Sequence, residues 1–129
     1  MPATRTFGFE FLERGDGHAT VRMPAAEDTL QVERVVHGGA LSGLADTAAV
    51  YLLLPALGDG QAMTSIEFKI NFLRPVLADR GPIEAQARLV KHGRTIAVAN
   101  VDVLQSGALC ATGVFTYLIM DADRGTAAG

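Results

Sequence analysis

Two glycines and a carboxylate further along the chain are the residues best suited to chemistry at a carbonyl group. His37-Gly38-Gly39 directly precedes a long apolar segment that is predicted to be a helix. Backbone N–H groups at a helix start have no partner within the helix, so they attract an oxyanion or a polarised carbonyl oxygen. The alternative is that the glycines only let the helix start pack closely against a sheet.

Asp46 is the only charged residue in the apolar segment 38–57. Asp is a poor helix former and is costly to bury without partners. Because Ala45, Ala48 and Ala49 surround it, we expect its carboxylate to lie in a cleft as a general base or nucleophile. A solvent-facing Asp is the alternative interpretation.

The spacing of Gly38 and Asp46 predicts how they would cooperate. The two residues are eight positions apart, which is about 12 Å along a helix. One small reacting group cannot touch both in the same chain, since general-base and oxyanion contacts are about 3 Å long. A second, antiparallel copy of the helix would bring its own Asp46 to Gly38, giving two sites in a two-fold symmetric dimer.

Other polar residues near these two are candidates for supporting roles. His37 is expected to position the helix start by a hydrogen bond. The amide of Gln31 could orient a water or the substrate carbonyl, or it could be a surface glutamine. Thr64 and Ser65, at the start of the next predicted strand, carry hydroxyls that could contact the water or the carboxylate, and Ser65 is the favoured one.

Basic residues gather on two predicted loops and could bind phosphates, although solvated loop tips often look the same. They are Arg74, which precedes a proline, and Lys91 and Arg94, which flank His92 and Gly93. Cys110 lies in an apolar run and is predicted to be a small core residue. His18, His37 and His92 are scattered, so no metal site is predicted.

These residues must be positioned by one long helix and six strands. Segment 38–57 is apolar on nearly all sides, as expected of a central helix of a folded domain. It is also nearly long enough to span a membrane, but its glycines, Asp46 and Pro55 argue against insertion. Alternating patterns or turn-bounded apolar runs predict strands at residues 6–12, 18–23, 65–72, 83–90, 95–104 and 108–119.

The order of these elements, ββαββββ, predicts one α+β domain over residues 1–129, in which an antiparallel six-stranded sheet wraps around the helix. Short separators containing glycine make the last three strands a meander. The polar segment 121–129 is predicted to be a frayed tail.

Composition excludes several classes of function. The 129 residues carry a net charge of −3, which disfavours nucleic acid as a partner. A single cysteine and the absence of a visible signal peptide indicate a cytoplasmic protein. The hydrophobic fraction of 49% is high for a lone monomer and suggests a buried subunit interface.

Taken together, several motifs resemble the hotdog-fold acyl-CoA thioesterases, in particular the phenylacetate-degradation and 4-hydroxybenzoyl-CoA types. They are Val36-His37-Gly38-Gly39, Leu44-Ala45-Asp46, Phe72-Leu73-Arg74-Pro75 and Gly93-Arg94. The resemblance spans roughly residues 31–118. It implies an antiparallel sheet wrapped around a long helix, dimers joined edge to edge, and dimers of dimers.

The resemblance also implies hydrolysis of an acyl-CoA thioester to a carboxylic acid and coenzyme A, without a metal or other cofactor. Asp46 matches the acid of the family, Gly38 its carbonyl-binding amide, and Gln31 its side-chain amide. Gly39, Thr64, Arg74, Lys91, Gly93 and Arg94 are the expected contacts to substrate or coenzyme A. Relatives usually have Asn-x-x-Gly-x-x-His, whereas this chain has Gln31 and Arg34 at the first two positions.

The sequence therefore predicts a cytoplasmic, tetrameric thioesterase for small aromatic or medium-chain acyl-CoA. Two alternatives remain open at this stage. A non-catalytic acyl-CoA-binding hotdog module would keep the pocket without needing Asp46. A hotdog hydratase or dehydratase would need an Asp and a His in one pocket, whereas His37 precedes the helix and Asp46 lies two turns inside it.

Overall fold

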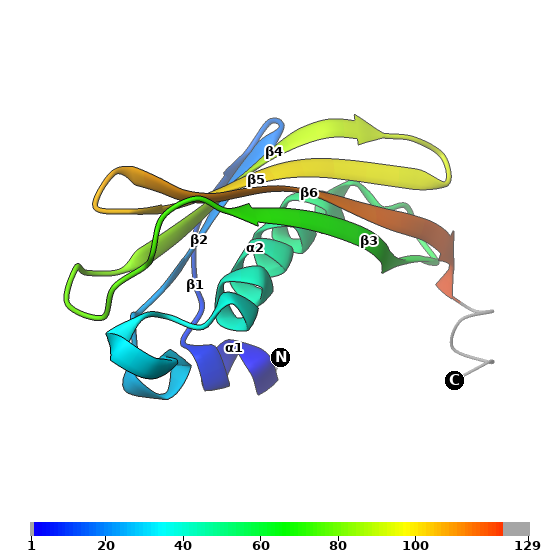
Figure 1. Cartoon of the computed structure of the whole chain (residues 1–129). Helices are drawn as coiled ribbons and strands as arrows, with labels where there is room; N and C mark the ends of the chain where they lie inside the picture. The colour runs from blue at the N-terminus through cyan, green and yellow to red at the C-terminus, as the bar shows by residue number, and fades with distance from the viewer. Residues whose placement is uncertain (1, 123–129) are drawn as a thin grey trace.

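The computed structural model of the chain describes residues 2–122. A six-stranded antiparallel sheet arches over one long helix, α2, which lies against its concave face (Figure 1). This is the hotdog architecture that the sequence predicts. The strands are β1 (Glu10–Gly15), β2 (His18–Met23), β3 (Gln61–Phe72), β4 (Ile83–His92), β5 (Ile96–Gln105) and β6 (Ala108–Asp121), and the helices are α1 (Pro2–Phe7), η1 (Glu27–Thr29), η2 (Val32–Arg34), α2 (Gly38–Leu53) and η3 (Leu54–Ala56).

The spatial order of the strands is β1-β2-β4-β5-β6-β3. β4, β5 and β6 form the predicted meander, since each pairs with the next through a short turn. β3 does not join β4 but pairs with β6, the last strand. The sheet therefore has two edges, β1 and β3, and α2 lies between them.

The core fills the space between α2 and the sheet. Alternate residues of the strands face the helix, and small alanines let helix and sheet approach closely. The buried helix residues are Ala40, Leu41, Leu44, Ala45, Ala48, Ala49, Leu52 and Leu53. The segment Gly38–Ala56 is long and apolar enough to cross a membrane by length and composition, but a buried core helix passes the same test.

Two boundaries that the sequence predicted at the ends of the chain are wrong. The strand expected at residues 6–12 begins only at Glu10, because residues 2–7 form α1. Asp121, expected as the first residue of a frayed tail, instead pairs with Gln61 at the end of β6. Residues 123–129 of that predicted tail lie outside the described residues.

β3 differs from its predicted pattern in phase and in burial. A bulge between Ser65 and Glu67 interrupts the pairing with β6, so Ser65 opposes Tyr117 while Phe68 opposes Phe115. Residues paired across antiparallel strands share a face, so Ser65 and Phe68 both face α2. Strict alternation predicted them on opposite faces. β3 is also mostly exposed rather than half-buried, because it is an edge.

Candidate active site

The start of α2 carries a backbone donor that no group in the described chain uses. His37 is the N-cap, and its Nδ1 accepts a hydrogen bond of 2.8 Å from the N–H of Gly39. The N–H groups of Ala40 and Leu41 donate to the carbonyl of His37. Within residues 2–122, the N–H of Gly38 has no hydrogen-bond partner. Gly38 rather than Gly39 therefore offers its N–H to a ligand.

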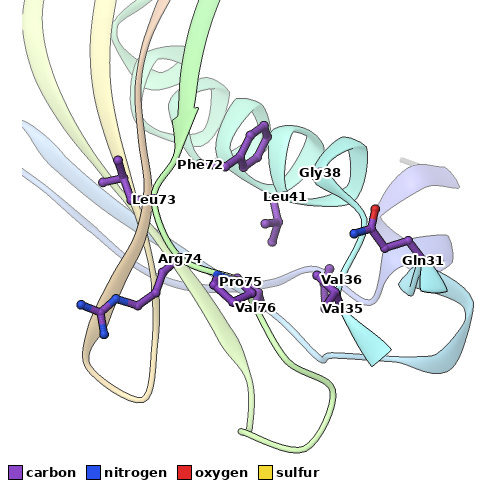
Figure 2. Close-up of a pocket in the computed structure, with 10 residues that line it drawn as sticks. All are labelled: Gln31, Val35, Val36, Gly38, Leu41, Phe72, Leu73, Arg74, Pro75 and Val76. Atoms are coloured by element: carbon purple, nitrogen blue, oxygen red, sulfur yellow. The ribbon is translucent and has the colours of Figure 1, made fainter. Parts of the chain in front are cut away.

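A cavity of about 380 Å³ opens beside this free N–H (Figure 2). The ring of Phe72 lies over Gly38, so closely that a Cβ at position 38 would sit 3.2 Å from Phe72 Cζ. The guanidinium of Arg74 points away from Gln31 in the same view. The lining residues are Gln31, Val35, Val36, Gly38, Leu41, Phe72, Leu73, Arg74, Pro75 and Val76.

The loop that leads into the cavity is strained. Glu33 and Arg34 have φ angles of 60° and 63°, a left-handed conformation that costs an ordinary residue about 1–2 kcal/mol. Hydrogen bonds on either side hold the loop: Gln31 N–H donates to Val35 O and His37 N–H donates to Thr29 O, each over 2.7 Å. Arg34 occupies the position where the resemblance expects glycine, and this backbone conformation explains that preference.

Asp46 lies near the middle of α2, partly buried, with its carboxylate tied to the sheet. The hydroxyl of Tyr117, from β6, donates a hydrogen bond to Asp46 Oδ1. The same hydroxyl also lies 3.3 Å from the backbone oxygen of Asp46. Burial, the hydrogen bond to Asp46 and the charge of Asp46, in that order, raise the pKa of Tyr117 far above its ordinary value. Tyr117 therefore keeps its proton and acts as a donor.

Sequence reasoning did not single out Tyr117. It sits in a strand of alternating apolar residues, where a tyrosine looks like any other core side chain. The available signal was chemical, because a buried tyrosine hydroxyl usually finds a hydrogen-bond partner. In a fold with one apolar helix, the lone carboxylate of that helix is the natural acceptor.

Of the two hydroxyls predicted near the carboxylate, only Ser65 faces α2. Ser65 is the register partner of Tyr117, so it lies on the same face of the sheet beside the residue that contacts Asp46. Thr64 pairs with Leu118 and points to the opposite face. The β-bulge that follows Ser65 adjusts its direction relative to the rest of β3.

The predicted coenzyme A contacts are divided between the two ends of the molecule. Arg74 follows β3 at the end where α2 begins. Lys91, Gly93 and Arg94 are at the turn between β4 and β5, at the other end of the sheet (Figure 1). His92 there lines a second cavity with Leu52, Leu53, Pro55 and Ala56, from the end of α2 and η3. One chain therefore does not bring these groups together.

Among residues 2–122, Cys110 and the possible metal-binding side chains indicate no second site. Cys110 is buried, and its Sγ lies 3.4 Å from the backbone oxygen of Ala108. In the part of the chain from residue 2 to residue 122, no three His, Cys, Asp or Glu side chains gather in a way that could hold a metal ion. The free N–H of Gly38 and the carboxylate of Asp46 are therefore the candidate reactive groups in the described part of the chain.

Several proteins that are similar to this chain in sequence or fold are thioesterases. The chain is 28% identical over 100 residues to the acyl-coenzyme A thioesterase PaaI of Escherichia coli K12, an alignment covering 78% of this chain and 69% of that protein. A thioesterase from Haemophilus influenzae superposes with a TM-score of 0.87 at 27% identity, over 93% of this chain and 83% of the other. A mutant of the phenylacetic acid degradation protein PaaI from Thermus thermophilus superposes with a TM-score of 0.80 at 28% identity. That superposition covers 92% of this chain and 98% of the other.

A match to a family model shows which family the chain belongs to. The model of the thioesterase superfamily matches residues 33–112. That range runs from the strained loop through α2 and β3 to the fifth residue of β6, and so contains Gly38, Asp46 and Ser65. The chain belongs to the thioesterase superfamily.

Proposed function

We propose that the chain hydrolyses an acyl-CoA thioester to a carboxylic acid and free coenzyme A, at a site shared between two copies of the chain. The observation that carries this proposal is that a free N–H and a lone carboxylate lie two turns apart on one helix. The similarity to an acyl-coenzyme A thioesterase supports the substrate class. The acyl group would be small and aromatic or of medium chain length. The rings of Phe68 and Phe115, which stack with centroids 5.2 Å apart on the helix-facing side of the sheet, would offer it an apolar contact.

The proposed chemistry uses the N–H of Gly38 and the carboxylate of Asp46 for different tasks. The thioester oxygen accepts a hydrogen bond from Gly38 N–H, and the helix dipole stabilises the charge that develops on it. Asp46 of the partner chain either removes a proton from a water that attacks the carbonyl carbon, or attacks it directly to form a mixed anhydride. In both routes the C–S bond breaks, and the coenzyme A thiolate leaves and takes up a proton. In the second route a water molecule then hydrolyses the mixed anhydride, which releases the carboxylic acid and restores the Asp46 carboxylate.

The edge strand β3 is suited to bring two such helices together. Its exposed apolar residues include Ile66, Phe68 and Phe72, with exposed fractions of 52%, 47% and 52%. On this strand Phe72 marks the level of Gly38, and Ser65 marks the level of Asp46. Antiparallel pairing of β3 with a second β3 would place Ser65 of one chain near Phe72 of the other, so each Asp46 would approach the other Gly38.

The charges on β3 favour one register for this pairing. The level midway between Ser65 and Phe72 falls at Phe68 and Lys69. If the two-fold axis passes at Phe68, Glu67 of each chain pairs with Lys69 of the other, which is a favourable cross-strand pair. If the axis passes at Lys69, two lysines face each other, which is unfavourable. We therefore place the axis at Phe68.

The same arrangement suggests where the phosphates of coenzyme A bind. Antiparallel pairing would bring the β4–β5 turn of one chain toward the end of the other chain where Arg74 lies. Arg74 of one chain and Lys91 and Arg94 of the other would then form one basic surface for phosphates. Assembly of two dimers into a tetramer and catalysis without a cofactor stay predictions from the resemblance. A cytoplasmic location stays a prediction from the single cysteine and the lack of a visible signal peptide.

The first experiment measures the release of free thiol from a panel of acyl-CoAs by the wild type and Asp46→Asn. We expect kcat to fall by about 10³-fold or more in the variant, because the group that activates water or attacks is lost. Activity that survives the substitution would contradict the role of Asp46. Ligand binding without turnover by the wild type would favour the binding module, and hydration of an enoyl-CoA would favour the hydratase.

A second experiment tests whether the site is shared. Gly38→Pro removes the N–H at the first helical position, which tolerates proline, and His37 already has the extended backbone that precedes proline well. Gly38→Ala is the matched control, because it adds a Cβ against Phe72 and keeps the N–H. Co-expressed Gly38→Pro and Asp46→Asn chains should recover about 25% of wild-type activity, since half of the dimers contain one intact site. A site within one chain would give no recovery.

A further inference from the structure

Tyr117 ties the sheet to the carboxylate that does the proposed chemistry. We propose that Tyr117 is a positioning residue that holds Asp46 Oδ1 through its hydroxyl and leaves Oδ2 as the reactive oxygen. The inference rests on the proposed function, because it assumes that the Asp46 carboxylate acts in the reaction. No motif in the resemblance includes Tyr117.

The two oxygens of Asp46 have different surroundings. Oδ1 accepts the hydrogen bond from Tyr117. Within the described chain, Oδ2 makes no hydrogen bond, yet it is not among the polar side-chain atoms sealed from solvent. A carboxylate held by one oxygen keeps a fixed orientation and leaves the other oxygen free for a water or an acyl carbon. The structure thus divides one side chain into an anchored atom and an accessible atom.

Tyr117 is a rigid anchor. It belongs to β6, which is paired on both sides, with Ala97 of β5 and Ser65 of β3 as its register partners. Its exposed fraction is 2%, and it is among the largest fully buried side chains. Its raised pKa keeps the hydroxyl protonated, so it can only donate to the carboxylate. A side chain so enclosed can fix the torsion angles of Asp46 before the substrate arrives.

Both candidate routes are compatible with this role, and Tyr117 gives up no proton in either. If Asp46 is a general base, the proton of the attacking water passes to Oδ2 while Oδ1 keeps its hydrogen bond. If Asp46 is a nucleophile, Oδ2 forms the new bond to the acyl carbon as the C–S bond breaks. Oδ1 then becomes the carbonyl oxygen of the anhydride and still accepts from Tyr117.

The test compares Tyr117→Phe with Tyr51→Phe, since the chain has two tyrosines. Each substitution removes one hydroxyl and keeps the ring. We expect Tyr117→Phe to lower kcat by about 10- to 100-fold with little change in KM, because a freely rotating carboxylate misplaces the reactive oxygen. Tyr51→Phe should behave as wild type. Unchanged kcat in Tyr117→Phe, with a wild-type melting temperature, would overturn the proposal.

A double variant separates positioning from a purely structural role. If Tyr117 acts through Asp46, adding Tyr117→Phe to Asp46→Asn should cause no further loss of residual activity. An equal fractional loss in both backgrounds would overturn the proposal. If Asp46→Asn itself keeps the wild-type kcat, it is the proposed function that fails, whatever Tyr117→Phe does.

A spectroscopic measurement tests the contact without activity and without removing the hydroxyl. In a Tyr51→Phe background, 3-fluorotyrosine labels position 117 alone. Its ¹⁹F resonance should shift when Asp46→Asn removes the charge of the acceptor, and should stay in place for Asp59→Asn, a control in the exposed turn before β3. A ¹⁹F chemical shift that stays the same in both variants would show that Tyr117 does not contact the carboxylate.

Discussion

The two edges of the sheet are built in opposite ways. β1 has six residues, all exposed, and is interrupted by a bulge between Phe11 and Glu13. Three of its residues are charged, Glu10, Glu13 and Arg14, and they flank the exposed side chains of Phe11 and Leu12. Arg14 reaches α2, where it donates to Tyr51 O over 3.2 Å and lies 4.4 Å from the centre of the Tyr51 ring. β3 has twelve residues and exposes large apolar side chains.

The difference between the two edges indicates that β3, rather than β1, is suited to pair with a strand of another chain. Short length, charges and bulges are the devices by which proteins prevent an edge from adding another strand. β1 uses all three. β3 is long and apolar along the stretch after its own bulge, and such a surface is typical of a contact with another chain. The sheet is therefore closed at one edge and open at the other.

The largest expected effect comes from placing a charge in the middle of the open edge. Phe68→Asp should convert the dimer to a monomer and lower kcat/KM by about 10³-fold, because the proposed site needs both chains and two like charges would meet near the axis. Phe68→Leu is the matched control and should stay dimeric. Light scattering with chromatography measures the mass, and a Phe68→Asp variant that stays dimeric would place the interface elsewhere.

A smaller effect should follow from reversing one charge beside the axis. Glu67→Lys replaces two attractive pairs by two repulsive ones, so the dissociation constant of the dimer should rise by about 10- to 100-fold. The double variant Glu67→Lys/Lys69→Glu restores opposite charges and should recover wild-type dimerisation. Analytical ultracentrifugation over a dilution series measures both. If the double variant is as weak as the single one, the register with the axis at Phe68 is wrong.

The smallest effect is expected at the closed edge. Phe11→Lys removes the contact between the Phe11 and Tyr51 rings, whose centroids lie 4.8 Å apart. The free energy of unfolding should fall by about 1 kcal/mol, the usual size of an aromatic pair. Oligomeric state and thioesterase activity should not change. If Phe11→Lys changed the oligomeric mass and Phe68→Asp did not, β1 rather than β3 would be the edge that pairs with another chain.

Most of the fold follows from periodicity, and the deviations have local causes. Segment 38–57 predicts α2 because it is apolar on nearly all sides, as expected of a helix that a sheet surrounds. The end of α1 was assigned to a strand because Phe7, Phe9 and Phe11 recur at every second position, which imitates a strand pattern. The reversed face of Ser65 was also missed, since a bulge inserts one residue into a pattern that continues to alternate on either side of it.

The candidate site was less predictable than the fold. The spacing of Gly38 and Asp46 along the chain converts directly into a separation on a helix, so the proposal of a site shared between two chains could be made from the sequence. The contact between Tyr117 and Asp46 joins residues far apart in the sequence, and no spacing rule encodes it. The left-handed backbone of Arg34 is likewise imposed by hydrogen bonds on either side of it rather than by its residue type.

The pairing of β3 with β6 also sets the order in which the chain can fold. β3 leaves the ribosome before β4, β5 and β6, yet its partner within the chain is the last strand made. Until β6 arrives, both edges of β3 and its apolar side chains are unprotected, and such strands are the usual sites of aggregation during synthesis. A chain released before β6 would contain the α2 segment with Gly38 and Asp46 but would lack Tyr117, and its β3 would have no strand of its own chain to join.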